Sequence, residues 1–332
     1  MTGRSRFAAG LAIATVGPLV LAPILAPSRG NGTSQVLGIL VVVAYAGHVA
    51  VTGWLWTVPD VRHTVRTRSL RMVVLPVALV AVAATLALAL PDQPLRLLLL
   101  GFFAWQFSHF QRQNLGLVKR ISANWSDEPI GKTECRVVVL AGWCGTGALL
   151  ARPSFLGLPN VVVPTIGTEM VVHMVAVAYA TCTFAAVILI LRRRRPVPVA
   201  AAYLISILFM APVFLFHSAE AAVTGMVVAH GLQYLWAVRV RIRHARIAEG
   251  RTGWEATFGV VAGAILGGAA LEAMSELHSA QPGGLRLLYG AYLGVVMAHF
   301  AVDGVLWRRP IQRTVTSHRR WALLPSPAHG RL

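Results

Sequence analysis

Apolar runs of about 20 residues recur from one end of the chain to the other, and this repetition constrains the fold most strongly. A bilayer core needs about 20 apolar residues per helix. No polar stretch is left over for a separate soluble domain. The sequence therefore predicts an all-α, polytopic bundle of about ten transmembrane helices, forming a single integral membrane domain over residues 1–332. The predicted spans are 7–26, 36–56, 71–90, 95–118, 134–151, 166–191, 198–216, 221–238, 255–274 and 286–307.

Composition and charge agree with a multi-pass protein of the cell membrane. Hydrophobic residues make up 56% of the chain and charged residues 13%, whereas about a quarter of the residues of soluble proteins are charged. A net charge of +18 would raise nucleic acid as a partner, but the basic residues form short clusters in alternate loops. This asymmetry predicts that both termini are cytoplasmic and accounts for the charge without nucleic acid. The clusters lie near residues 4–6, 62–71, 119–132, 192–195, 239–251 and 308–320.

The first apolar run follows the basic segment MTGRSR, so it also has features of a signal peptide. It is long and lacks a clean small-x-small cleavage site, which favours a retained helix. Cys135, Cys144 and Cys182 are odd in number and show no C-x-x-C spacing. We therefore expect them to pack in apolar helices and not to form disulfides or a zinc ribbon.

Four predicted spans carry a histidine at the same predicted depth. Ionisable residues are costly inside a bilayer, so each is a candidate functional residue. All four spans are predicted to run toward the cytoplasm, and each histidine lies eight to ten residues before the end of its span or before the basic cluster that follows the span, at Trp56, Lys119, Arg239 and Arg308. At about 1.5 Å per residue, all four lie roughly 12–15 Å from the cytoplasmic end. They are His48, His109, His230 and His299.

Each of these histidines is followed one helical turn later by a polar residue, in the segments HVAVT, HFQRQN, HGLQ and HFAVD. Residues three or four positions apart share a helix face. A metal-bound imidazole usually needs an acceptor at its other nitrogen. We predict that the four histidines bind a metal, with Asp303 as a ligand or acceptor and with Asp303, Gln113 and Gln233 as candidate catalytic residues. The alternative is interhelical hydrogen bonding, at about 1 kcal/mol each. The fourth polar neighbour is Thr52.

A second, weaker group is predicted on the outer side. Glu169 and His173 are four residues apart near the start of one span, and His217 and Glu220 flank the turn between two others. His173 is expected about 15 Å above the first layer, so one compact site cannot include both groups. The alternative is that the second pair is simply solvated. The remaining histidines lie in predicted loops or tails and are expected to be solvated; they are His63, His244, His278, His318 and His329.

Neutral imidazoles with one carboxylate suit iron, zinc or copper, whereas magnesium and calcium prefer oxygen ligands. A hydrolytic zinc site needs about three ligands and an open position, and the sequence offers more nitrogen ligands than that. We therefore expect one or two iron ions that activate dioxygen, in a metal-dependent membrane oxidoreductase or oxygenase. Its partner would be a lipophilic small-molecule substrate that enters laterally from the lipid bilayer.

Two alternatives remain open from the sequence. Haem could be bound by two facing histidines, although two-haem cytochromes usually place their histidine pairs at two depths and these four are level. A proton-coupled transporter or channel could use the same residues as a relay, although no internal repeat is visible. The motifs of P-loop, dinucleotide-binding, H-E-x-x-H and G-x-S-x-G proteins are absent, as are the histidine boxes of membrane desaturases.

Single histidines on many helices, with HFAVD on the last, resemble the bacterial carotene-cleaving dioxygenases of the Brp/Blh type. Those are polytopic iron enzymes with histidine ligands on separate helices. The resemblance covers helix number and histidine distribution and carries no ligand over residue by residue. It implies an oxygen-dependent membrane enzyme and does not imply carotene as the substrate.

Overall fold

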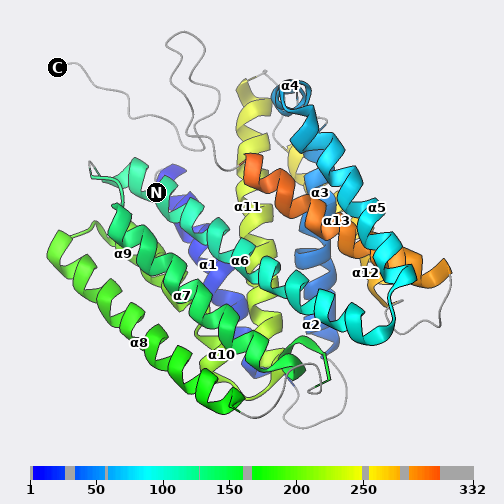
Figure 1. Ribbon diagram of the computed structural model, residues 1–332. Helices are drawn as coiled ribbons and strands as arrows, with labels where there is room; N and C mark the ends of the chain where they lie inside the picture. The colour runs from blue at the N-terminus through cyan, green and yellow to red at the C-terminus, as the bar shows by residue number, and fades with distance from the viewer. Residues whose placement is uncertain are drawn as a thin grey trace.

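The computed structural model describes residues 3–26, 34–56, 59–126, 128–159, 167–248, 254–276 and 284–306. These residues form a bundle of helices and contain no β-strand (Figure 1). The α-helices are α1 (Gly3–Leu25), α2 (Gln35–Leu40), α3 (Gly47–Leu55), α4 (Pro59–Thr67), α5 (Leu75–Ala89), α6 (Asp92–Trp125), α7 (Lys132–Ala151), α8 (Thr168–Arg193), α9 (Val197–Leu208), α10 (Pro212–Leu215), α11 (Gly225–Ala248), α12 (Trp254–Ser275) and α13 (Gly284–Leu306). Short π-helical segments η1 (Val41–Ala46), η2 (Leu70–Val74) and η5 (Glu220–Thr224) lead into α3, α5 and α11, and η3 (Pro153–Leu156) is a 3-10 turn.

Eight helical segments of the described residues are long and apolar enough to cross a membrane, which indicates a multi-pass membrane protein. Each coincides with one of the predicted apolar runs. The other two predicted spans do not meet the same criteria. One falls on α6, which is 34 residues long and carries many polar side chains. The other is divided between α9, of 12 residues, and α10, which begins at Pro212, where the ring removes a backbone donor.

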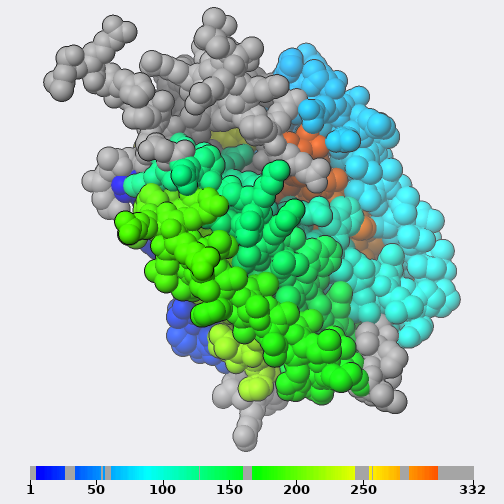
Figure 2. Space-filling view, turned by 60° about the vertical axis from the view of Figure 1, so that its left-hand side comes forward, coloured from blue at the N-terminus to red at the C-terminus, as the bar shows by residue number. Residues whose placement is uncertain are grey.

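The surface of the bundle is apolar where a soluble protein would be polar. On α8, the side chains of Met174, Val177 and Phe184 are 63%, 68% and 68% exposed. Figure 2 shows the face formed by α7 to α9 turned outward, with no other element covering it. Contiguous exposed apolar surface of this kind is costly in water, so lipid is the solvent that suits this face.

Close helix contacts depend on small residues. Helix α13 packs along α5, α1 along α11, α7 along α8 and α12 along α3. A Cβ atom added at Gly290 of α13 would lie 2.6 Å from the carbonyl oxygen of Ala83 on α5. Glycine at this position therefore allows the two backbones to touch, which is how helices commonly associate in membranes.

Two segments that the sequence predicts as loops are helical in the structure. Pro59–Thr67 forms α4; proline fits the first helical position, where no backbone donor is needed. Its Val61 is buried, whereas Arg62 and His63 are exposed to solvent as expected. Helix α11 continues to Ala248 and thus includes His244. The other three histidines predicted to be solvated, His278, His318 and His329, lie outside the described residues.

A buried ion pair closes one end of the bundle. Arg195, after α8, donates from Nε to Glu134 Oε1 at 3.0 Å and from Nη2 to Oε2 at 2.8 Å. The backbone N–H of Gly131 donates to the same carboxylate at 2.6 Å. This two-pronged contact fixes the first turn of α7 to the turn between α8 and α9, since both charged groups are removed from solvent.

Candidate metal centre

Four helices bring the predicted histidines together in a closed ring. His48 comes from α3, His109 from α6, His230 from α11 and His299 from α13. Ring centroids are 4.6 Å apart for His48 and His299, and 4.9 Å apart for His48 and His230. The two remaining sides, from His109 to His230 and to His299, measure 5.1 and 5.3 Å. All four side chains are buried, so the predicted common depth corresponds to one compact cluster in the bundle interior.

Glycines and a helix irregularity make this close approach possible. A Cβ atom added at Gly231, next to His230, would collide with the carbonyl group of Ala44. One added at Gly47, next to His48, would lie 2.6 Å from the carbonyl oxygen of Ala264. The π-helical η1 ends immediately before Gly47, and such segments frequently occur at functional sites because they change the direction of the side chains that follow.

Hydrogen bonds fix the tautomer of two of the rings. Nδ1 of His48 lies 3.1 Å from the carbonyl oxygen of Ala44, which can only accept, so this nitrogen carries the hydrogen. Thr52 uses its single hydroxyl hydrogen on the carbonyl of His48 and therefore accepts from Nδ1 of His299 at 2.7 Å. Both rings consequently hold a free lone pair at Nε2. Neutral imidazoles oriented in this way have the lone pair that a metal ligand needs.

Asp303 completes the cluster from the same helix as His299. Its Oδ2 lies 3.6 Å from Nε2 of His299 and 3.7 Å from Nε2 of His109. Two ligand atoms at about 2.0–2.1 Å from one tetrahedral ion are about 3.4 Å apart, so these separations are close to those of a coordinated pair. Two groups have ligand atoms that all lie within 4.8 Å of one another: His48 with His230 and His299, and His109 with His299 and Asp303. His299 belongs to both, which suits one ion or an adjacent pair.

Several ring nitrogens in this cluster make no hydrogen bond. They are Nε2 of His48, His109 and His299 and both nitrogens of His230. A buried polar atom without a partner costs about 1–3 kcal/mol, and native proteins leave few of them. Interhelical hydrogen bonding, the alternative role for these histidines, accounts for Nδ1 of His299 and leaves these five nitrogens without a partner. Buried ring nitrogens that converge without hydrogen-bond partners are an arrangement that a bound cation could satisfy.

Aromatic rings wall the cluster, and the sequence reasoning missed them. Phe110 stacks on His230 at 4.0 Å between centroids, and Phe300 stacks on His109 at 4.5 Å. The hydroxyl of Tyr234 hydrogen-bonds Thr52 at 2.7 Å. Tyr234 lies four residues after His230 on the same helix face. The same helical spacing that indicated Gln233 could therefore have indicated Tyr234 as well. The His-Phe pair that occurs in both HFQRQN and HFAVD was a second sequence signal, because it contains the two phenylalanines that stack on the ring.

Gln113 and Gln233 lie beside the ring and form a network of their own. Gln113 Nε2 donates to the carbonyl of His230 and to Gln233 Oε1, both at 3.2 Å. Gln233 Nε2 donates to Asn114 Oδ1 at 3.0 Å and to Thr15 Oγ1 at 2.8 Å. These contacts join α1, α6 and α11. The amides thus hold the helices that carry His109 and His230, and Gln113 also lines a cavity with His109.

The second predicted group does not form a cluster. Glu169 and His173 on α8 and His217 before η5 are exposed, and Glu220 is partly buried. Nδ1 of His173 hydrogen-bonds the backbone carbonyl of Glu169 at 2.7 Å. Among the described residues, none of the four belongs to a group with three ligand atoms in reach of one ion.

A cavity of about 560 Å³ leads to the cluster between α5, α6 and α13. His109 and Asp303 form its inner wall, and apolar residues such as Leu75 and Leu79 line its side. Basic side chains at Arg112 and Lys119 stand at its mouth. This cavity therefore reaches the residues His109 and Asp303, although their ligand atoms are themselves buried.

Comparison with known proteins gave no match to a protein family, to a curated protein or to a solved structure.

Proposed function

We propose that the protein is a membrane-embedded metalloenzyme, an iron-dependent oxidoreductase or oxygenase that acts on a lipophilic substrate. The observation that carries the proposal is the buried ring of His48, His109, His230 and His299 beside Asp303, in which five ring nitrogens have no hydrogen-bond partner. Mixed nitrogen and carboxylate ligands suit iron, with zinc or copper as alternatives. One or two ions fit the two overlapping ligand groups.

The spacing of the rings favours an ion over haem. Neighbouring imidazoles lie 4.6–5.3 Å apart between centroids, edge to face. A porphyrin between two of them would have to displace the others. The level arrangement of four histidines supports the same choice, because a haem uses two axial ligands.

The chain's own residues would prepare this site in definite ways. Thr52 and the Ala44 carbonyl hold His299 and His48 with Nε2 turned inward, and Phe110 and Phe300 exclude water from the other two rings. The bound metal would supply the redox chemistry and the activation of dioxygen. A lipophilic substrate would enter from the bilayer through the cavities that adjoin the ring.

The topology that accompanies this proposal is the ten-helix one, with α6 and the α9–α10 pair as the two further spans. Both termini then lie in the cytoplasm and the protein lies in the cell membrane. The cavity at His109 opens toward Arg112 and Lys119, which this topology assigns to the cytoplasmic side. Cysteine accessibility at an introduced Cys in α4 and in the 277–283 segment, measured in intact cells, would give opposite labelling if the topology is correct.

Metal content and activity test the function directly. Protein purified without chelator should contain metal in about stoichiometric amount, and each of the four histidine-to-alanine variants should lose it while keeping its helical spectrum. Oxygen consumption by the iron-loaded protein with a lipid extract should disappear in the same variants. Folded wild-type protein without metal would sink the proposal.

A proton-coupled transporter or channel is the second candidate, because one cavity is lined by His109 and Asp303 and a second is lined by Tyr45, Gln106 and Val227, each three residues before a ring histidine. Alternating access requires openings of this kind on each side of a central site. Proton-coupled uptake by vesicles containing metal-free protein would favour the transporter. Loss of the metal together with loss of oxygen consumption would favour the enzyme.

A further inference from the structure

A larger pocket, of about 860 Å³, lies on the side of the histidine ring away from the predicted cytoplasmic end. Its lining residues include Tyr45, Gln106 and Val227. Each of them precedes a histidine of its own helical segment by three residues, namely His48, His109 and His230. Residues three apart share a helix face at a rise of about 1.5 Å per residue. The deep end of the pocket is therefore one helical turn from the candidate metal centre.

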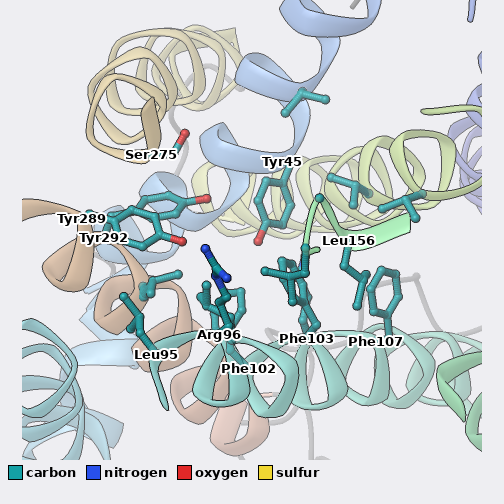
Figure 3. Close-up of a pocket in the computed structure, with 18 of the residues that line it drawn as sticks. Tyr45, Leu95, Arg96, Phe102, Phe103, Phe107, Leu156, Ser275, Tyr289 and Tyr292 are labelled. Atoms are coloured by element: carbon teal, nitrogen blue, oxygen red, sulfur yellow. The ribbon is translucent and has the colours of Figure 1, made fainter. Parts of the chain in front are cut away.

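Arg96 places in this pocket a positive charge that no described residue pairs with. Figure 3 shows its guanidinium pointing into the cavity, toward the hydroxyl groups of Tyr45 and Tyr292. The side chain is partly buried and, within the described ranges, makes no hydrogen bond or ion pair. The other arginine of the lining, Arg286, is different, because it donates to Asp92 Oδ1 at 3.1 Å and to the Leu90 carbonyl at 3.0 Å. The pocket consequently presents one free guanidinium, which matches a single anionic group.

A second polar group, the side-chain amide of Gln106, lies at the opposite end of the pocket. Gln106 is 3% exposed, and its Oε1 is buried without a hydrogen-bond partner. Between Arg96 and Gln106 the wall of α6 is apolar, formed by Leu99, Phe102 and Phe103. Ten residues of helix separate the two polar groups, a distance of about 15 Å. A ligand that pairs with Arg96 and extends along this wall as far as Gln106 must be long, apolar in the middle and charged at one end.

We propose that this pocket binds a single-chain, long-chain carboxylate. The carboxylate pairs with the fork of Arg96, the chain lies against Leu99, Phe102 and Phe103, and its far end reaches Gln106. At about 15 Å, a chain of roughly 12 carbons spans the distance. The carboxylate then lies near the hydroxyl groups of Tyr45, Tyr289 and Tyr292, which surround the guanidinium of Arg96 (Figure 3). The assignment as substrate, with the far end facing the histidine ring, rests on the proposed function; the binding itself does not.

The test is equilibrium binding of radiolabelled dodecanoate to the full-length protein in detergent, after treatment with chelator. Saturable binding of about one molecule per chain is expected, with dodecanol binding more weakly than dodecanoate. Replacing Arg96 by glutamine should weaken dodecanoate binding by about 10- to 100-fold, because a charge-assisted, two-pronged contact is lost. The same change should leave dodecanol binding unaltered, and Arg96→Lys should restore part of the affinity.

Arg112→Gln is the matched control, since this arginine lies at the mouth of the other cavity, and it should bind dodecanoate as the wild type does. Equal affinity for dodecanol and dodecanoate in the wild type would overturn the proposal without recourse to any variant. So would displacement of dodecanoate by an equimolar amount of phosphatidylglycerol, or an unchanged affinity in Arg96→Gln. Because binding is measured without metal, the two proposals can fail separately: folded wild-type protein that contains no metal when purified without chelator, yet binds dodecanoate, would refute the proposed enzyme and leave the pocket assignment intact.

Discussion

If the histidine ring binds an ion, the variant His230→Leu should be more stable than the wild type without metal and less stable than the wild type with metal. Both nitrogens of His230 are buried without a hydrogen-bond partner, and the ring stacks on Phe110 at 4.0 Å. Each such atom costs about 1–3 kcal/mol, and leucine keeps most of the packing volume. In the presence of a chelator we therefore expect the variant to be more stable than the wild type, by about 1–3 kcal/mol.

In the presence of metal the wild type should be the more stable protein. A ligand at 100 times its dissociation constant adds about 2.7 kcal/mol to the stability of the folded state, and at 1,000 times about 4.1 kcal/mol. The variant should lose most of this stabilisation by bound metal, because one ligand is missing. Thermal unfolding in detergent, once with chelator and once with added metal, measures the stability of both proteins under both conditions. The control is His173→Leu on the exposed part of α8, which should match the stability of the wild type under both conditions. Added metal that stabilises the wild type by no more than it stabilises the variant refutes the metal site.

Three further changes separate ligand positioning from general folding. Thr52→Val removes the acceptor of His299 Nδ1 and should weaken metal affinity about 10- to 100-fold, as measured by competition with a chromogenic chelator, whereas Thr52→Ser should not. Gly231→Ala forces α11 away from Ala44 and should cost about 1–3 kcal/mol in thermal unfolding while also lowering metal content. Glu134→Ala leaves Arg195 buried without its carboxylate and should cost about 3–5 kcal/mol with metal affinity intact in the folded fraction.

The depth argument located the histidine ring because it depends on two regular quantities. Helical rise is constant, and basic residues cluster after the spans that carry the histidines, so counting from Lys119 or Arg308 places a histidine along its helix to within about one turn. Burial inside the bundle is then expected, because contact between a polar imidazole and lipid is costly. Apolar length located the helices for the same reason, and eight of the predicted runs coincide with helices long enough to cross a membrane.

The partners of each ring could not be predicted in the same way, because they depend on helix rotation and on contacts between helices. Thr52 was expected to accompany His48, its neighbour in sequence, but its hydroxyl accepts from His299, 247 positions away. Gln233 was expected in the site and instead contacts Asn114 and Thr15. The π-helical η1 changes the rotation just before His48, and a pattern based on 3.6 residues per turn cannot register that change.

Elemental analysis combined with an absorption spectrum of the purified protein tests the central claim most directly. The buried ring of His48, His109, His230 and His299 predicts one or two iron, zinc or copper atoms per chain, no Soret band, and loss of the metal in each single alanine variant. Folded wild-type protein that contains no metal, after growth in metal-supplemented medium and purification without chelator, would contradict it.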